Sequence, residues 1–127
     1  MSRICVVCLC LLVSFSLAAS AMAADRDAIT QNVDQVASEI NSGTSPEDIQ
    51  ANDYEPYVYV MQDDGMLLVH PELEGESLKE LATPVYDAIM QATFDGSWVD
   101  YEWKGKQKHA YVRMTDGGLI VGSGYTE

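Results

Sequence analysis

The sequence predicts an α+β protein built on an antiparallel β-sheet, and three features of the chain support this fold class. The first is an amphipathic helix pattern that begins near residue 25. The second is a set of five β-rich runs joined mostly by hairpin-like turns, which favours antiparallel pairing. The third is one helical segment between the second and third runs. Because hairpins link the strands everywhere except across this segment, we expect the helices to lie on one face of the sheet.

The first 23 residues have the pattern of a secretory signal peptide. Arg3 precedes an apolar run of 16 residues, Ile4–Ala19, and Ala21–Ala23 is a small-x-small cleavage site. The alternative is an uncleaved membrane anchor, but a membrane span usually needs about 20 apolar residues. We therefore expect a mature protein that is periplasmic or secreted and that has no membrane span.

The chain is strongly acidic, with 20 acidic residues, 7 basic residues and a net charge of −13. A protein of this charge repels nucleic acids and anionic membrane surfaces, so neither is an expected partner. All three cysteines lie within the predicted signal peptide, so the mature chain should contain no disulfide. The remaining length is enough for one hydrophobic core and one domain.

Two helical segments are expected at the start of the mature chain. Across residues 25–41, apolar side chains recur at helical spacing and form one stripe. This stripe either packs on the sheet or forms a homodimer seam. In the next segment, Ser45 can cap a short helix whose first position is Pro46. The members of the stripe are Ile29, Val33, Val36 and Ile40.

The five strands are expected where β-branched and aromatic residues lie between turn residues. The tight turn Asp63-Asp64-Gly65 joins the first two strands into a hairpin. A loop containing Pro71 follows, and a helix then begins at Thr83-Pro84 and ends near residue 96. The expected strands are residues 57–62, 66–69, 98–103, 109–114 and 119–125.

Two stretches of the sequence carry a family pattern: "YVYVMQDDGMLLVHPELEGESL" and "GSWVDYEWKGKQKHAYVRMTDGGLIVGSGY". The pattern contains an aromatic first strand, a D-G turn, a second strand that ends in His-Pro, a G-x-W-x-x-Y-x-W strand, a K-x-x-Y strand and a final V-G-S-G-Y. In this order the marks resemble the single Cache domain. This domain is the extracytoplasmic PAS-like sensor module of bacterial chemoreceptors and histidine kinases. The resemblance covers residues 57–125.

The resemblance implies a PAS-like five-stranded antiparallel sheet with a long N-terminal helix, a helical crossover and a ligand pocket between the sheet and the crossover. It divides the chain into a signal peptide (1–23), an N-terminal helical region (24–56) and a single Cache-like sensor domain (57–127). Small monocarboxylates are the usual ligands of single-pocket members.

Family receptors continue beyond the last strand into a second membrane span and a signalling domain, whereas this sequence ends at Glu127. We therefore expect a sensory module for signal transduction or chemotaxis that acts through a separate membrane receptor or kinase. The alternative is a periplasmic protein–protein interaction partner without a small-molecule ligand.

The candidate ligand residues are aromatic and basic side chains on the strands. His70 either donates to a ligand carboxylate or caps the sheet edge, and the tyrosines either line the pocket or belong to the core. Lys108 is the preferred cation, since Lys104 and Lys106 fall at the turn. On a regular pleat, however, Lys108 faces away from Tyr111. The full candidate set is Tyr59, His70, Tyr101, Trp103, Lys108, Tyr111 and Arg113.

Metal, cofactor and catalytic sites have little support in the sequence. The segment "HPELEGE" alternates histidine and glutamates on a loop, which is more typical of a solvated acidic loop than of a metal site. No G-x-S-x-G motif is present, and no cysteine remains after the signal peptide to act as a nucleophile. We therefore expect a binding protein without a cofactor and not an enzyme.

Overall fold

The structure is a computed structural model that describes residues 26–127. The predicted signal peptide, residues 1–23, lies outside the described residues. Five strands form one antiparallel sheet: β1 (Tyr59–Met61), β2 (Leu67–Val69), β3 (Ser97–Trp103), β4 (Lys106–Met114) and β5 (Ile120–Thr126). Their spatial order is β2-β1-β5-β4-β3, so the first strand lies beside the last in the middle of the sheet. The predicted fold class, an α+β protein with a PAS-like five-stranded antiparallel sheet, is confirmed.

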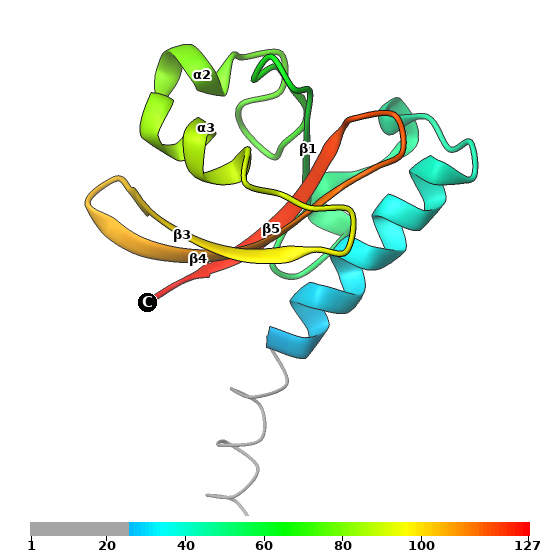
Figure 1. Cartoon of the computed structure of the whole chain (residues 1–127), viewed down its shortest axis with the longest axis horizontal. Helices are drawn as coiled ribbons and strands as arrows, with labels where there is room; N and C mark the ends of the chain where they lie inside the picture. Colours follow the sequence, from blue (N-terminus) through cyan, green and yellow to red (C-terminus); the bar gives the residue numbers. More distant parts are fainter. Residues whose placement is uncertain (1–25) are drawn as a thin grey trace, which may run out of the picture.

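Helices cover both faces of the sheet, and the expectation that they would lie on one face is wrong (Figure 1). The reason is visible in the central strands. Every residue of β1 is buried, and so are the first five residues of β5, because alternate side chains of these strands point to opposite faces. Each face therefore exposes apolar surface to water unless a helix covers it.

The N-terminal helix, residues 26–41, packs on one face of the sheet. Ile29, Val33 and Val36 are fully buried against Val60 and Val121 of the central strands. The apolar stripe of this helix thus packs on the sheet, and Ile40 is the one member of the stripe that is only partly buried. Two short 3-10 helices follow, η1 (Pro46–Asp48) and η2 (Ala51–Asp53), where one short helix was expected.

The opposite face is covered by the helical crossover between β2 and β3, which consists of α2 (Leu78–Leu81) and α3 (Thr83–Ile89). The α2 helix was not expected, although Ser77 caps it by accepting a hydrogen bond from the Glu80 N–H. The hydroxyl of Tyr86 in α3 donates to the Asp63 carbonyl oxygen at 2.6 Å. This hydrogen bond ties the crossover to the β1–β2 hairpin and fixes its position above the sheet.

Within residues 26–127, no helix combines the length and the apolar character that crossing a membrane requires.

Candidate functional site

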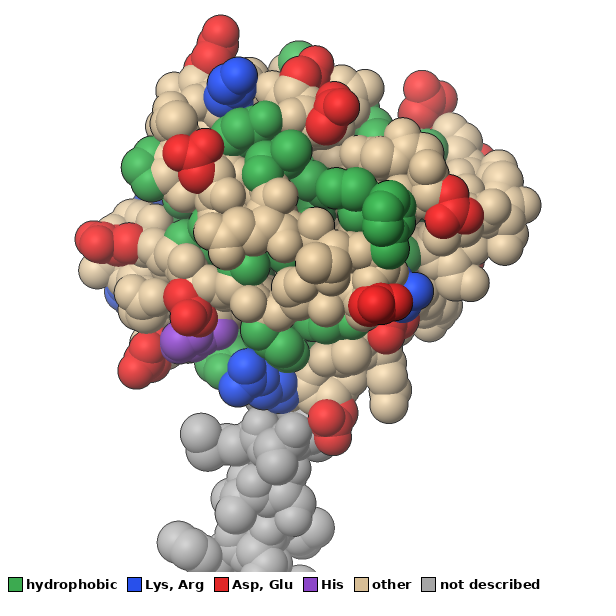
Figure 2. All heavy atoms as spheres, viewed as in Figure 1, with side chains coloured by type: hydrophobic (Ala, Val, Ile, Leu, Met, Phe, Trp, Pro, Cys, Tyr) green, Lys and Arg blue, Asp and Glu red, His purple; other side chains and the backbone are tan. Residues whose placement is uncertain are grey.

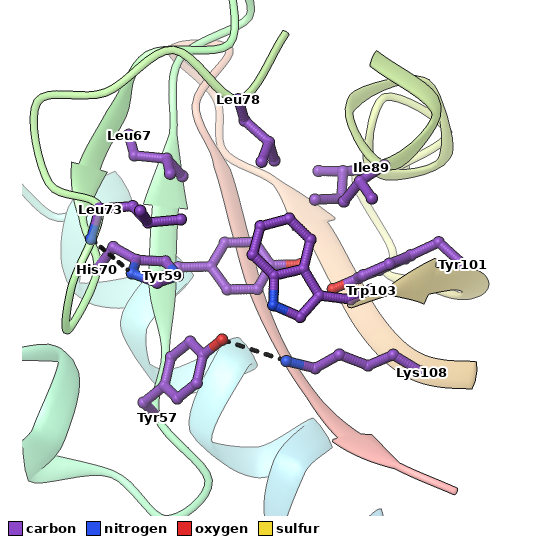
Figure 3. A pocket seen from close by; sticks show the side chains of 11 residues that line it. Tyr57, Tyr59, Leu67, His70, Leu73, Leu78, Ile89, Tyr101, Trp103 and Lys108 are labelled. Carbon is purple, nitrogen blue, oxygen red and sulfur yellow. Dashed lines mark hydrogen bonds between the residues drawn. The ribbon is translucent and has the colours of Figure 1, made fainter. Parts of the chain in front are cut away.

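A small cavity lies between the sheet and the helical crossover, where the sequence predicted a pocket (Figure 3). Its volume is about 30 Å³, which is room for about two water-sized groups. Most of the space between the two layers is therefore filled by side chains. The cavity is lined by Tyr57, Tyr59, Leu67, His70, Leu73, Leu78, Val85, Ile89, Tyr101, Trp103 and Lys108.

Lys108 places a positive charge at this cavity. Its side chain is only 8% exposed, although lysine is among the residues least often buried. The ammonium group donates a hydrogen bond to the Tyr57 hydroxyl at 3.2 Å and lies 5.0 Å from the centre of that ring. The ion pairs among residues 26–127 involve only His109 and Arg113 as cations, so no carboxylate of this part of the chain lies within ion-pair distance of Lys108.

The hydroxyl groups of Tyr59 and Tyr101 point toward each other inside the cavity (Figure 3). Tyr59 is 4% exposed, and its hydroxyl is the one buried side-chain polar atom within residues 26–127 that has no hydrogen-bond partner. Burial raises the pKa of Tyr101 to about 12 and raises that of Tyr59 well above 10. Both phenols are therefore protonated at physiological pH and can donate hydrogen bonds.

His70 lines the cavity and also closes a local turn. Its Nδ1 atom accepts hydrogen bonds from the backbone N–H groups of Glu72 and Leu73, both at 3.0 Å. Burial, followed by the positive charge of Lys108, lowers its pKa to about 4. The ring is therefore neutral near pH 7, and because Nδ1 accepts, the proton lies on Nε2, which remains a donor. The imidazole thus caps two backbone N–H groups of the turn through Nδ1, and its role toward a ligand stays a prediction.

Tyr57 was not among the predicted site residues, although it lines the cavity and accepts the hydrogen bond from Lys108. Its ring also meets that of His70 edge to face, with 5.2 Å between the ring centres. The sequence contained a signal for it, because Tyr57 and Tyr59 are two residues apart and therefore share one face of the first strand. The sequence contained no such signal for the apolar residues that the crossover contributes to the cavity, because α2 and α3 reach the cavity only through tertiary packing.

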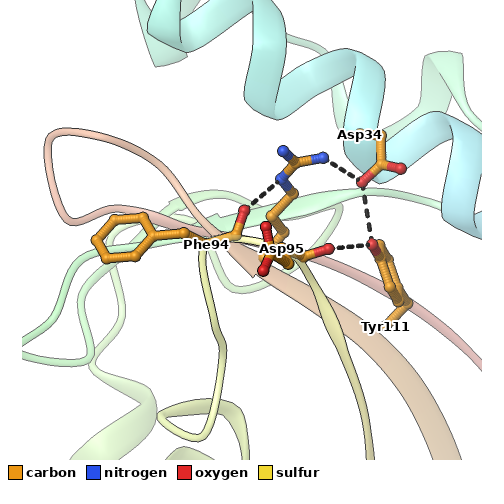
Figure 4. Close-up of polar contacts among 5 residues, drawn as sticks. Asp34, Phe94, Asp95 and Tyr111 are labelled. Carbon is orange, nitrogen blue, oxygen red and sulfur yellow. Dashed lines mark hydrogen bonds and ion pairs between the residues drawn. The ribbon is translucent and has the colours of Figure 1, made fainter.

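Tyr111 and Arg113, which were predicted as ligand residues, do not line the cavity. Both side chains lie on the opposite face of the sheet, where they meet Asp34 of the N-terminal helix (Figure 4). Arg113 binds the Asp34 carboxylate at 2.8 Å, and the Tyr111 hydroxyl donates to the same oxygen at 3.1 Å. The physical reason is the pleat of β4, which points alternate residues to opposite faces, so that Lys108 and Tyr111 diverge.

Of the seven predicted site residues, the structure therefore brings five to one cavity: Tyr59, His70, Tyr101, Trp103 and Lys108. Together with Tyr57, they surround a small space with hydrogen-bond donors, one cation and no carboxylate. Hydrogen-bond donors and a buried cation are the groups that bind an anion in a low-dielectric site.

No protein-family model matches the chain, and no curated protein matches it either. Among solved structures, the chain is similar to a methyl-accepting chemotaxis protein from Vibrio parahaemolyticus, with 13% sequence identity and a TM-score of 0.49 over 84% of this chain and 91% of that one. It is also similar to the ligand-binding domain of Mlp24 with asparagine, with 15% identity and a TM-score of 0.39 over 55% of this chain and 28% of that one. Both similarities are distant and concern the fold alone.

Proposed function

We propose that the protein is an extracytoplasmic sensory module that binds a small monocarboxylate, with the carboxylate group in the cavity between the sheet and the helical crossover. The Lys108 ammonium would receive the carboxylate, and the hydroxyl groups of Tyr57 and Tyr59 would donate further hydrogen bonds. The resemblance of the strand motifs to the single Cache domain supports the sensory role, and the predicted signal peptide supports the extracytoplasmic location.

The observation that carries this proposal is a lysine that is only 8% exposed and that has no carboxylate within ion-pair distance among the described residues. A charge removed from water without a partner costs several kcal/mol, and an opposite charge in the same site offsets that cost. The chain has 20 acidic residues, yet none of those described forms an ion pair with Lys108. A bound anion would supply the missing charge.

The other donors favour a carboxylate over a cation. The Tyr59 hydroxyl is buried without a hydrogen-bond partner, and a ligand oxygen would satisfy it. The Nδ1 atom of His70 already accepts hydrogen bonds from two backbone N–H groups. His70 can therefore offer a ligand only the proton on Nε2. A cationic ligand would meet Lys108 and would find no acidic side chain in the lining.

The alternative expectation, a protein–protein interaction module, has less support. Such a module would bind its partner through the sheet edge or through the apolar stripe of the N-terminal helix, and that stripe is buried against the sheet. We therefore propose ligand binding as the function of the cavity.

The test is a thermal-shift titration with sodium acetate, with sodium chloride at equal ionic strength as the control. Binding adds about 2.7 kcal/mol at a ligand concentration one hundred times the dissociation constant. Lys108→Met should abolish the shift without lowering the stability of the free protein, because it replaces an unpaired buried charge by an apolar chain of similar length.

Lys106→Met is the matched control, since Lys106 is an exposed lysine on the same strand. It should leave the acetate shift unchanged. The proposal fails if neither acetate, propanoate, lactate nor pyruvate shifts the melting temperature of the wild-type protein. It also fails if Lys108→Met retains the full shift.

A further inference from the structure

A second, larger hollow adjoins the cavity on its outer side. This outer groove has a volume of about 430 Å³, which is within the range of small-molecule sites. Tyr57, His70, Leu73 and Trp103 line both the cavity and the groove, so these four side chains form the boundary between them. A ligand that passes this boundary would occupy both spaces at once.

The groove has an apolar wall that the cavity does not use. Leu81, at the end of α2, is 54% exposed and lines the groove beside Leu73 and Trp103. The only other large hydrophobic side chain exposed within residues 26–127 is Phe94, which is 60% exposed and lines none of the hollows described here. Figure 2 shows hydrophobic side chains that reach the surface in a band across this view of the molecule.

The cavity and the groove differ in size and in charge, and these differences indicate where each end of a ligand would lie. The cavity is lined by Lys108 and by no carboxylate. The groove is lined by one acidic and one basic side chain, Glu72 and Lys104, beside its apolar wall. The cavity has room for about two water-sized groups, which matches the two oxygen atoms of a carboxylate. An apolar group in the cavity would leave the Lys108 ammonium and the Tyr59 hydroxyl without partners, at a cost for each. An apolar group in the groove would instead cover Leu81.

We propose that the ligand is an amphipathic carboxylate whose head lies in the cavity and whose apolar chain lies in the outer groove. This inference rests on the proposed function, because it assigns the tail of the carboxylate that Lys108 binds. Leu81 and Leu73 then select ligands by chain length, while Lys108 selects them by charge.

The experiment is isothermal titration calorimetry of the full mature protein with acetate, butanoate and hexanoate. A buried methylene group tightens binding about fourfold, so hexanoate should bind at least about tenfold more tightly than acetate. Leu81→Ser should weaken hexanoate binding by about tenfold and leave acetate binding unchanged. The matched variant Phe94→Ser should change neither, because Phe94 is similarly exposed but lies outside the groove.

Each alternative outcome is distinguishable. Equal affinities for acetate and hexanoate, or an unchanged hexanoate affinity in Leu81→Ser, would overturn this inference and leave the proposed function in place. Absence of binding by all three acids would overturn both. Hexylamine carries a similar chain on a cationic head, and binding of hexylamine as tight as that of hexanoate would overturn the placement of the head beside Lys108.

Discussion

Tyr59 lies directly over Gly122, its partner in the register between β1 and β5. A methyl group at position 122 would overlap the outer end of the Tyr59 ring, including its hydroxyl. The missing side chain at Gly122 therefore makes the space in which Tyr59 crosses the sheet toward Tyr101. One wall of the cavity depends on this glycine.

Gly122→Ala should consequently destabilise the protein. The added methyl group forces a buried ring to move, and overpacking of this kind costs about 1–3 kcal/mol. Gly117→Ala is the control, because a methyl group at Gly117 meets no atom within 4 Å. Urea unfolding of the two variants measures the difference. Equal free energies of unfolding would show that the Tyr59 ring can move aside without destabilising the protein.

Tyr59→Phe should be neutral or stabilising in the absence of ligand. It removes a buried hydroxyl that has no hydrogen-bond partner, and such a group costs about 1–3 kcal/mol. Tyr111→Phe deletes a hydroxyl that donates to Asp34 and to the Asp95 carbonyl, so it should destabilise the protein by about 1 kcal/mol. Chemical denaturation measures the free energy of unfolding of both variants. A loss of stability in Tyr59→Phe as large as that in Tyr111→Phe would contradict the finding that the Tyr59 hydroxyl has no hydrogen-bond partner.

His70 should make the protein less stable as the pH falls from about 6.5 to about 4. Its pKa is lowered in the folded state, so the unfolded chain takes up a proton first, and the stability present above pH 6.5 is lost across this interval. After allowance for its partial exposure, we expect His70 to contribute about 1–2 kcal/mol of this loss. In His70→Asn the dependence of the unfolding free energy on pH should be flatter over this range.

The lowered pKa of His70 can be measured directly by NMR, by following the resonances of the two histidines of the chain as the pH changes. His109 contacts Asp100 and Glu127, and these hydrogen bonds raise its pKa above 6.5. The resonance of His70 should therefore titrate near pH 4 and that of His109 above pH 6.5. Two coincident midpoints would show that the imidazole of His70 is not held neutral by the cavity.

Asp34 should anchor the N-terminal helix to the sheet. Its carboxylate accepts from both Arg113 and Tyr111, and Arg113 also donates to the Phe94 carbonyl at 2.9 Å. Because the pair is partly exposed, Asp34→Ala should cost about 1–2 kcal/mol, and added salt should weaken the pair. Gln31→Ala, an exposed position on the same helix, should cost little by urea unfolding. Equal losses for the two variants would show that the contact adds nothing to stability.

Much of the fold was readable from local sequence. The five predicted strands lie within two or three residues of those observed, because β-branched and aromatic runs were separated by clear turn residues such as Asp64-Gly65. The N-terminal helix followed from its apolar spacing. The α2 helix was missed because four residues are too few for a periodic pattern, although Ser77 and Glu80 carried its capping pattern.

The face of each strand was harder to assign than its position. Alternation separates Lys108 from Tyr111, yet both were placed in the ligand site because each could supply a donor. Burial of both faces of β1 and β5 was also not recognised, since a continuous apolar run does not reveal what covers each side.

The sequence by itself determined the α+β class, the turns, the acidic charge and the residue types that could bind an anion, because these depend on spacing and composition along the chain. Tertiary structure alone decided that Lys108 is buried without a carboxylate beside it, that Gly122 admits the ring of Tyr59, and that α2 and α3 close the cavity from above. Those properties depend on contacts between segments far apart in the chain, whose distances no local pattern encodes.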